Sequence, residues 1–171
     1  MANKIIHKLF PSPVFQFKIE NHEEINKQLI EYIYGLKKED DQGIKRSNVN
    51  GWHSKNFKIE KDNVPYNFIK SIHGHIKEVI VDGFGWKYIP DKVGITEIWS
   101  IINKKGTFNT SHNHPGSYLS AAYYVKAPNE CGNIHFFDPN EIKRFNSPPI
   151  ENPTDLSTSG FSIKPEEGNL L

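Results

Sequence analysis

The stretch Lys105–Pro139, with the sequence KGTFNTSHNHPGSYLSAAYYVKAPNECGNIHFFDP, decides how the rest of the chain is interpreted. His112 and His114 stand two residues apart in it, directly before a β-rich run. In an extended chain, residues i and i+2 project to the same side, so both imidazoles can enter one cavity. Neutral imidazole suits iron, zinc, copper or nickel, whereas magnesium and calcium prefer oxygen ligands. The pattern predicts a transition-metal site, with two unligated loop histidines as the alternative.

The segments around this stretch have the pattern of β-strands. Alternation predicts strands over 118–126 and 133–137, and later over 161–163 and 169–171. Upstream, residues 92–102 carry apolar side chains on both faces, which is typical of a strand inside a two-sheet sandwich. The proline-rich segment 138–158 has no periodicity, and we expect a long loop that forms a lid or a binding wall.

The N-terminal half is predicted to add one strand and two helices. Residues 14–20 alternate as an edge strand, and Asn21 is a candidate N-cap for an amphipathic helix over 23–34. A second amphipathic helix is expected over 66–81, where His73 and His75 would point about 200° apart and could not chelate one metal. His53, beside Trp52, is interpreted as a structural histidine. The pattern predicts an α+β, mainly β chain forming a single domain over 1–171.

Composition narrows the class of partner. The 171 residues carry a net charge of +1 with the charges interspersed, which argues against a nucleic-acid groove and favours a small-molecule or protein partner. The single cysteine excludes an internal disulfide and suits a reducing compartment. No apolar run reaches the roughly 20 residues that a membrane span needs. We therefore expect a soluble cytoplasmic protein, and the wealth of lysine, asparagine and isoleucine suggests an AT-rich bacterial or phage genome.

Five blocks of the sequence carry a resemblance to a known family. They are SNVNGWHS, a strand containing Trp99, HNHPGSYLSAAYYV, CGNIHFFDP and KPEEGNLL. Their order resembles 2-oxoglutarate- and Fe(II)-dependent oxygenases of phages and bacteria, which are prolyl-hydroxylase-like, and it covers nearly the whole chain. Ala121 departs from the pattern, because a glycine is expected there. The resemblance implies a double-stranded β-helix (a jelly-roll, cupin-like fold) with two flanking N-terminal helices.

The same resemblance implies a site. His112 matches the first ligand of an HxD/E motif, and His114 stands where the carboxylate is expected. Asp138 is the nearest candidate for a substitute carboxylate, with capping of the following turn as the alternative. Tyr124 matches a tyrosine that hydrogen-bonds the cosubstrate, although a packed aromatic role is open, and Ser120 shares its strand face. The implied cofactors are Fe(II) and 2-oxoglutarate, with ascorbate as reductant.

The resemblance also predicts what is missing. In the family, a turn like Pro165–Gly168 leads into a strand with the remaining metal histidine, followed by an arginine that pairs with 2-oxoglutarate. The sequence stops at Leu171. We therefore expect a domain that lacks its last strands, does not turn over 2-oxoglutarate by itself, and associates into homo-oligomers through exposed strand edges.

Two other functions remain open at this point. Gly106-x5-His112-x-His114 looks like the opening of a cupin motif, which suggests a metal- or sugar-binding module without oxygenase activity. The glutamate that a cupin needs is absent, because Tyr118 and Leu119 stand in its place. The other alternative is a non-catalytic structural or interaction protein with a decayed site. The leading hypothesis is a dioxygenase, catalytic when full length, that hydroxylates an unidentified substrate.

Overall fold

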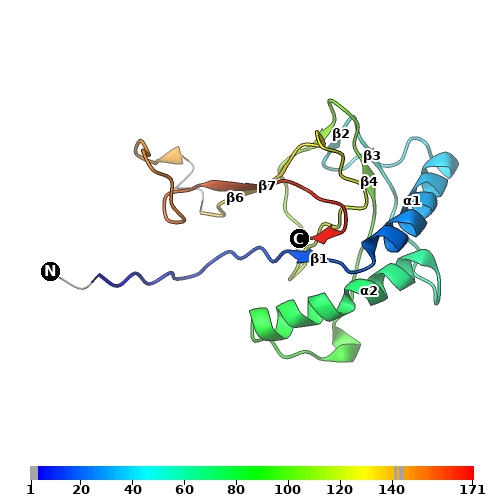
Figure 1. Cartoon of the computed structure of the whole chain (residues 1–171), viewed down its shortest axis with the longest axis horizontal. Helices are drawn as coiled ribbons and strands as arrows, with labels where there is room; N and C mark the ends of the chain where they lie inside the picture. Colours follow the sequence, from blue (N-terminus) through cyan, green and yellow to red (C-terminus); the bar gives the residue numbers. More distant parts are fainter. Residues whose placement is uncertain (1–3, 141, 143–144) are drawn as a thin grey trace. The chain divides into compact units, whose positions relative to one another are not determined.

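A computed structural model describes residues 4–140, 142 and 145–171 of the chain (Figure 1). It divides into two compact units, one formed by residues 16–131 and 166–171 and the other by residues 4–15 and 132–165. The expectation of a single domain over 1–171 stays a prediction.

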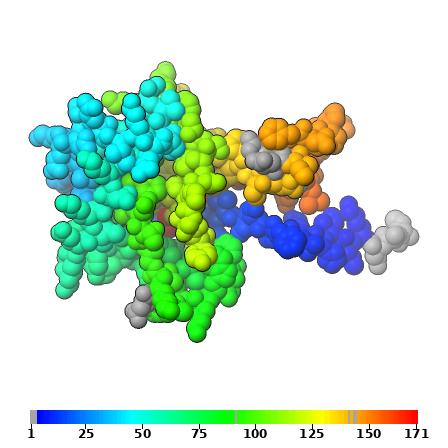
Figure 2. All heavy atoms as spheres, turned by 180° about the vertical axis from the view of Figure 1, so that it is seen from behind, coloured from blue at the N-terminus to red at the C-terminus, as the bar shows by residue number. Residues whose placement is uncertain are grey.

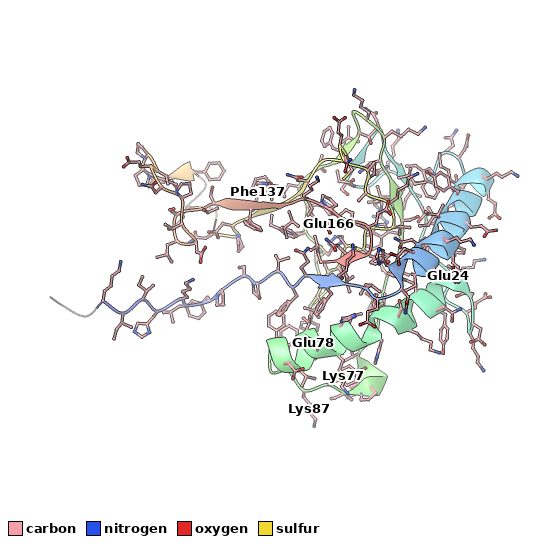
Figure 3. The ribbon with its side chains drawn as sticks, in the orientation of Figure 1. Glu24, Lys77, Glu78, Lys87, Phe137 and Glu166 are labelled. Atoms are coloured by element: carbon pink, nitrogen blue, oxygen red, sulfur yellow. The ribbon has the colours of Figure 1, made fainter. Side chains whose placement is uncertain are left out.

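Two helices cover one side of the larger unit. Helix α1 spans His22–Glu39 and contacts α2, which spans Val64–Glu78 and continues into a π-helical turn over Val79–Gly83 (Figure 1). Both predicted helices are confirmed, although α1 extends five residues further than expected. Their predicted apolar faces turn inward, with Leu29 and Ile33 of α1 and Ile72 of α2 buried. Glu24, labelled in Figure 3, lies on the exposed side of α1.

The two helices begin differently. Asn63 has an extended backbone and its Oδ1 accepts a hydrogen bond from the backbone N–H of Tyr66, which is the standard side-chain cap of a helix. Asn21 also occupies the position before its helix, as predicted, but its φ is 52° and its side chain makes no cap hydrogen bond. The capping function predicted for the Asn21 side chain is therefore wrong.

The hydrophobic core lies between these helices and a small antiparallel sheet. Strand β1 (Phe17–Lys18) pairs with β8 (Asn169–Leu170), and residues 122–124 lie along the other edge of β8. The buried core comprises side chains from these elements and from residues 52–57: Ile19, Leu29, Ile33, Trp52, Phe57, Phe68, Ile72 and Leu170. Only residues 122–124 of the predicted strand 118–126 are paired, because their hydrogen-bonding partner is the short segment 169–171.

A second antiparallel ladder runs along the same unit. Strand β2 (Asn48–Val49) pairs with β5 (Phe108–Asn109), and β3 (Trp52–His53) pairs with β4 (Ile101–Ile102). Hydrogen bonds from Ser54 to Ser100 and from Phe57 to Ile98 extend the ladder. The predicted strand over 92–102 is therefore too long: its first residue, Lys92, ends a 3₁₀ turn over Pro90–Lys92, and among the described residues the ladder bonds of this stretch begin at Ile98.

Between β4 and β5, residues 103–107 leave the ladder and form a loop. Opposite it, Gly51 approaches so closely that a Cβ on it would collide with the side-chain oxygen of Asn103. That side chain is held by the hydroxyl of Thr107 and by Asn109. The residue with a left-handed backbone at this point is Asn50, with φ 59°. Gly51 is required for close approach instead.

The smaller unit is built on one hairpin-like strand pair. Strand β6 (Ile134–Phe137) pairs with β7 (Gly160–Ile163) in the register Ile134 to Ile163, which confirms both predicted strands. Phe137, labelled in Figure 3, ends β6. Lys8 forms an exposed ion pair with Asp155 in this unit. The predicted loop 138–158 connects the strands, and its residues 141, 143 and 144 lie outside the described residues.

The described chain thus combines two α-helices with short antiparallel strand pairs, which is consistent with the expected α+β, mainly β class. The double-stranded β-helix stays a prediction, because the named strands of the described residues form four separate pairs. Among the described helices, none is long and apolar enough to cross a membrane.

Candidate metal site

The sequence His112-Asn113-His114, which we call the HNH motif, follows shortly after β5. The ring centroids of the two histidines are 5.0 Å apart and the ring planes are nearly perpendicular, at 76°. His112 is exposed and His114 is half-buried. The segment that carries them, yellow-green in Figure 2, lies on the surface of the larger unit. The structure therefore brings together the two imidazoles that the sequence predicted would share a site.

A backbone hydrogen bond selects the tautomer of the neutral His112 ring. Its Nδ1 lies 2.7 Å from the carbonyl oxygen of Thr110. A carbonyl can only accept, so Nδ1 must carry the proton, and in the neutral ring the lone pair is then on Nε2. Metal-binding histidines commonly have this kind of outer hydrogen bond, which fixes both the tautomer and the ring orientation. Thr110 is itself anchored, because its N–H donates to the carbonyl of Ser47 at 2.9 Å.

Two further rings continue from His114 into the interior. Trp99 lies 5.5 Å from His114, and His53 stacks on Trp99 at 5.7 Å with an interplanar angle of 13°. His53 is only 5% exposed, and its Nδ1 donates to the carbonyl of Ser54 at 2.6 Å. We call His53, Trp99, His114 and His112 the aromatic row. The sequence did not predict that His53 and Trp99 belong to this row, because the two residues are far apart in the chain. The β3–β4 register is what places them on one face.

The two neighbouring tyrosines point to opposite faces of their segment. Tyr123 packs on Phe68 at 4.8 Å, and its hydroxyl donates to Oδ1 of Asn26 at 2.7 Å. Tyr124 faces the other side, where burial raises its pKa to about 12 with a smaller contribution from Cys131. Its hydroxyl is therefore protonated at neutral pH and can donate a hydrogen bond. Ser120 is exposed and stands four residues before Tyr124 in the sequence.

Asp138 has a local structural interaction. Its Oδ1 accepts a hydrogen bond from the N–H of Asn140 at 2.8 Å, and its own N–H donates to the carbonyl of Ser159. This is the turn-capping role that the sequence left open beside a ligand role. Asp138 belongs to the smaller unit and the histidines to the larger one. Its ligand role stays a prediction.

Three other histidines have partners elsewhere. His73 lies 2.7 Å from the hydroxyl of Tyr88, and His75 packs against Phe17 at 4.7 Å. His135 bonds Ser162 across the β6–β7 pair.

The donor set at the HNH motif fits part of an iron site. Neutral imidazole is a normal ligand for Fe(II), and the Nδ1 bond of His112 leaves its Nε2 available. In the part of the chain that the structure describes, no group of three or more histidine, cysteine, aspartate or glutamate side chains could hold a metal ion. The described residues thus provide two neighbouring imidazoles, with ring centroids 5.0 Å apart.

Comparison with known proteins agrees with this chemistry. Residues 97–171 match a family model described as "Putative 2OG-Fe(II) oxygenase". No curated protein matches the chain. No solved structure matches it either. The matched segment contains Trp99, both histidines, Tyr124 and Asp138, whereas His53 lies outside it. A 2OG-Fe(II) oxygenase implies Fe(II) and 2-oxoglutarate as cofactors and a small-molecule or protein substrate. Residues 97–171 of the chain are therefore similar to 2OG-Fe(II) oxygenases.

Proposed function

We propose that this protein is a 2-oxoglutarate- and Fe(II)-dependent dioxygenase that hydroxylates a small-molecule or protein substrate, and that its domain spans residues 1–171. The observation that carries the proposal is the geometry at the HNH motif. His112 donates from Nδ1 to Thr110, and the His114 ring lies 5.0 Å away, within the segment that matches the oxygenase family. Two neutral imidazoles of this kind are suitable donors for Fe(II).

Each site residue has a distinct role in this proposal. His112 and His114 hold the iron, and Asp138 is the candidate carboxylate ligand. When bound, Fe(II) supplies O₂ activation that is coupled to the decarboxylation of 2-oxoglutarate to succinate. The protein positions the donors beforehand: the Thr110 carbonyl orients His112, and Trp99 lies against His114.

Tyr124 and Ser120 are the proposed contacts of the cosubstrate. A carboxylate needs hydrogen-bond donors, and the Tyr124 hydroxyl, like any tyrosine hydroxyl at neutral pH, is protonated and can donate; burial raises its pKa further, to about 12. No hydrogen bond of this hydroxyl is found among the described residues. Ser120 is exposed and provides a second hydroxyl from the same segment.

Anaerobic titration tests the proposal. Fe(II) added with 2-oxoglutarate should produce a weak visible charge-transfer band, and the band should disappear in His112→Ala. His135→Ala is the matched control, because it removes an exposed histidine whose Nδ1 also has a hydrogen bond, here to Ser162. This variant should keep the band.

The other outcomes contradict the proposal in different ways. Iron binding that is indifferent to 2-oxoglutarate would favour a cupin-like metal-binding module. Absence of iron binding would favour a non-catalytic protein. Asp138→Asn tests the carboxylate separately: an unchanged iron affinity would argue against a ligand role for Asp138.

A further inference from the structure

We propose that Trp99 is a positioning residue for His114, and that buried His53 holds Trp99 in place. The inference rests on the proposed function, because it concerns how the second imidazole is prepared for a metal. It adds a residue outside the segment that matches the oxygenase family, since His53 precedes residue 97.

The buried end of the aromatic row is firmly held. His53 pairs with Ile101 in the β3–β4 register, so Trp99 is its diagonal neighbour on the same face of the ladder. The two rings are nearly parallel, and His53 cannot rotate without breaking its 2.6 Å bond to the Ser54 carbonyl. Ser54 also anchors the residue after Trp99: its N–H donates to the Ser100 carbonyl and its Oγ accepts from the Ser100 N–H.

The exposed end of the aromatic row is held less strongly by its own backbone. His114 lies outside the named strands, directly before the turn at Pro115–Gly116, and its backbone carbonyl accepts one hydrogen bond, from Ser117. Its ring contacts are with Trp99 and His112. Unlike His112, whose ring is fixed by the Thr110 carbonyl, His114 depends on the face of Trp99 for its orientation. A ligand that is ordered before binding loses less rotamer entropy when the metal arrives.

Co(II) titration measures this positioning without enzyme turnover. An aromatic contact of this kind corresponds to roughly a three- to tenfold change in an equilibrium constant, so Trp99→Leu should weaken Co(II) binding by about that factor. Trp99→Phe keeps a flat ring and should bind within about twofold of the native protein. Trp86→Leu is the matched control, because Trp86 is 41% exposed and contacts Phe84 and Tyr118 instead. It should not change the affinity.

Fluorescence gives an independent signature of the contact. Paramagnetic Co(II) held by His114 should quench the emission of Trp99, whose ring lies 5.5 Å from the imidazole. The quenched fraction should be lost in Trp99→Phe and retained in Trp86→Phe. Native affinity in Trp99→Leu, or full quenching in Trp99→Phe, would overturn the inference.

The role of His53 is tested through the same affinity. His53→Phe preserves a stacked ring and should keep Co(II) binding closer to native than His53→Leu does. Far-UV circular dichroism and thermal unfolding identify any variant that has lost its fold, and the phenylalanine variants then carry the test. Equal Co(II) affinity of the two folded His53 variants would contradict the holding role.

The inference and the proposed function fail in distinguishable ways. If neither His112→Ala nor His114→Ala weakens Co(II) binding, the metal site itself is wrong and the inference falls with it. If both weaken binding but Trp99→Leu does not, the inference alone is wrong.

Discussion

Replacing Tyr123 with phenylalanine should destabilise the protein by about 1–3 kcal/mol, the usual cost of leaving a buried polar group unpaired. The Tyr123 hydroxyl donates to Oδ1 of Asn26 at 2.7 Å, and Asn26 is 5% exposed. Its Nδ2 is already buried without a hydrogen-bond partner among the described residues. The substitution would therefore leave both polar ends of the amide unsatisfied. For a chain of this length the melting temperature should fall by about 3–9 °C.

A double-mutant cycle with Asn26→Leu isolates the interaction. The leucine removes the amide together with its unpaired N–H, so Tyr123→Phe should cost much less in the Asn26→Leu background. Urea denaturation followed by circular dichroism gives the four free energies of unfolding. A coupling energy below about 0.5 kcal/mol would refute the reasoning, because it would mean that the hydroxyl and the amide act independently.

Three further predictions concern the same unit. Gly51→Ala should lower the free energy of unfolding by about 1–3 kcal/mol, because the added methyl group would displace the Asn103 side chain. Adding Asn103→Ala to the same chain should recover much of that loss, as measured by urea denaturation. Burial raises the pKa of both Tyr123 and Tyr124 to about 12. The stability that comes from keeping these hydroxyls protonated is therefore complete below pH 10 and is lost as the pH rises from 10 to 12. The melting temperature of a double phenylalanine variant should fall less steeply across that window. Asn63→Ala should cost about 1 kcal/mol through loss of the α2 cap, whereas a change below about 0.3 kcal/mol by thermal unfolding would contradict it.

The helices could be predicted from the sequence because their signals are local. Apolar residues at helical spacing identified the buried faces of both helices, and these faces pack inward as expected. The strands 134–137, 160–163 and 169–170 were also found, because alternation is a local signal too. Alternation could not predict how many residues of each strand form hydrogen bonds to a partner strand. Residues 118–126 and 92–102 read as full strands, but pairing depends on how much partner chain lies beside them.

The candidate site likewise has features that the sequence predicts and features that it does not. The i, i+2 spacing of His112 and His114 was sufficient to predict that their rings meet. The Thr110 carbonyl that fixes His112 requires a particular loop geometry, which no spacing encodes. His53 was interpreted as structural because it stands alone in sequence, and its stacking partner Trp99 lies beyond a helix. Asp138 remained ambiguous, since a carboxylate after a strand suits both a turn and a metal.

The ladder that supports the aromatic row has a consequence for the order of folding. It joins residues 47–57 to residues 98–110, so α2 and its π-helical turn lie entirely within the chain loop that the ladder closes. Non-local pairing of this kind raises contact order and slows folding, whereas helix formation is fast. The helix can thus form while the HNH loop is still unstructured. His114 gains its contact with Trp99 only when the ladder closes, so the proposed metal site would be complete only after the ladder has formed.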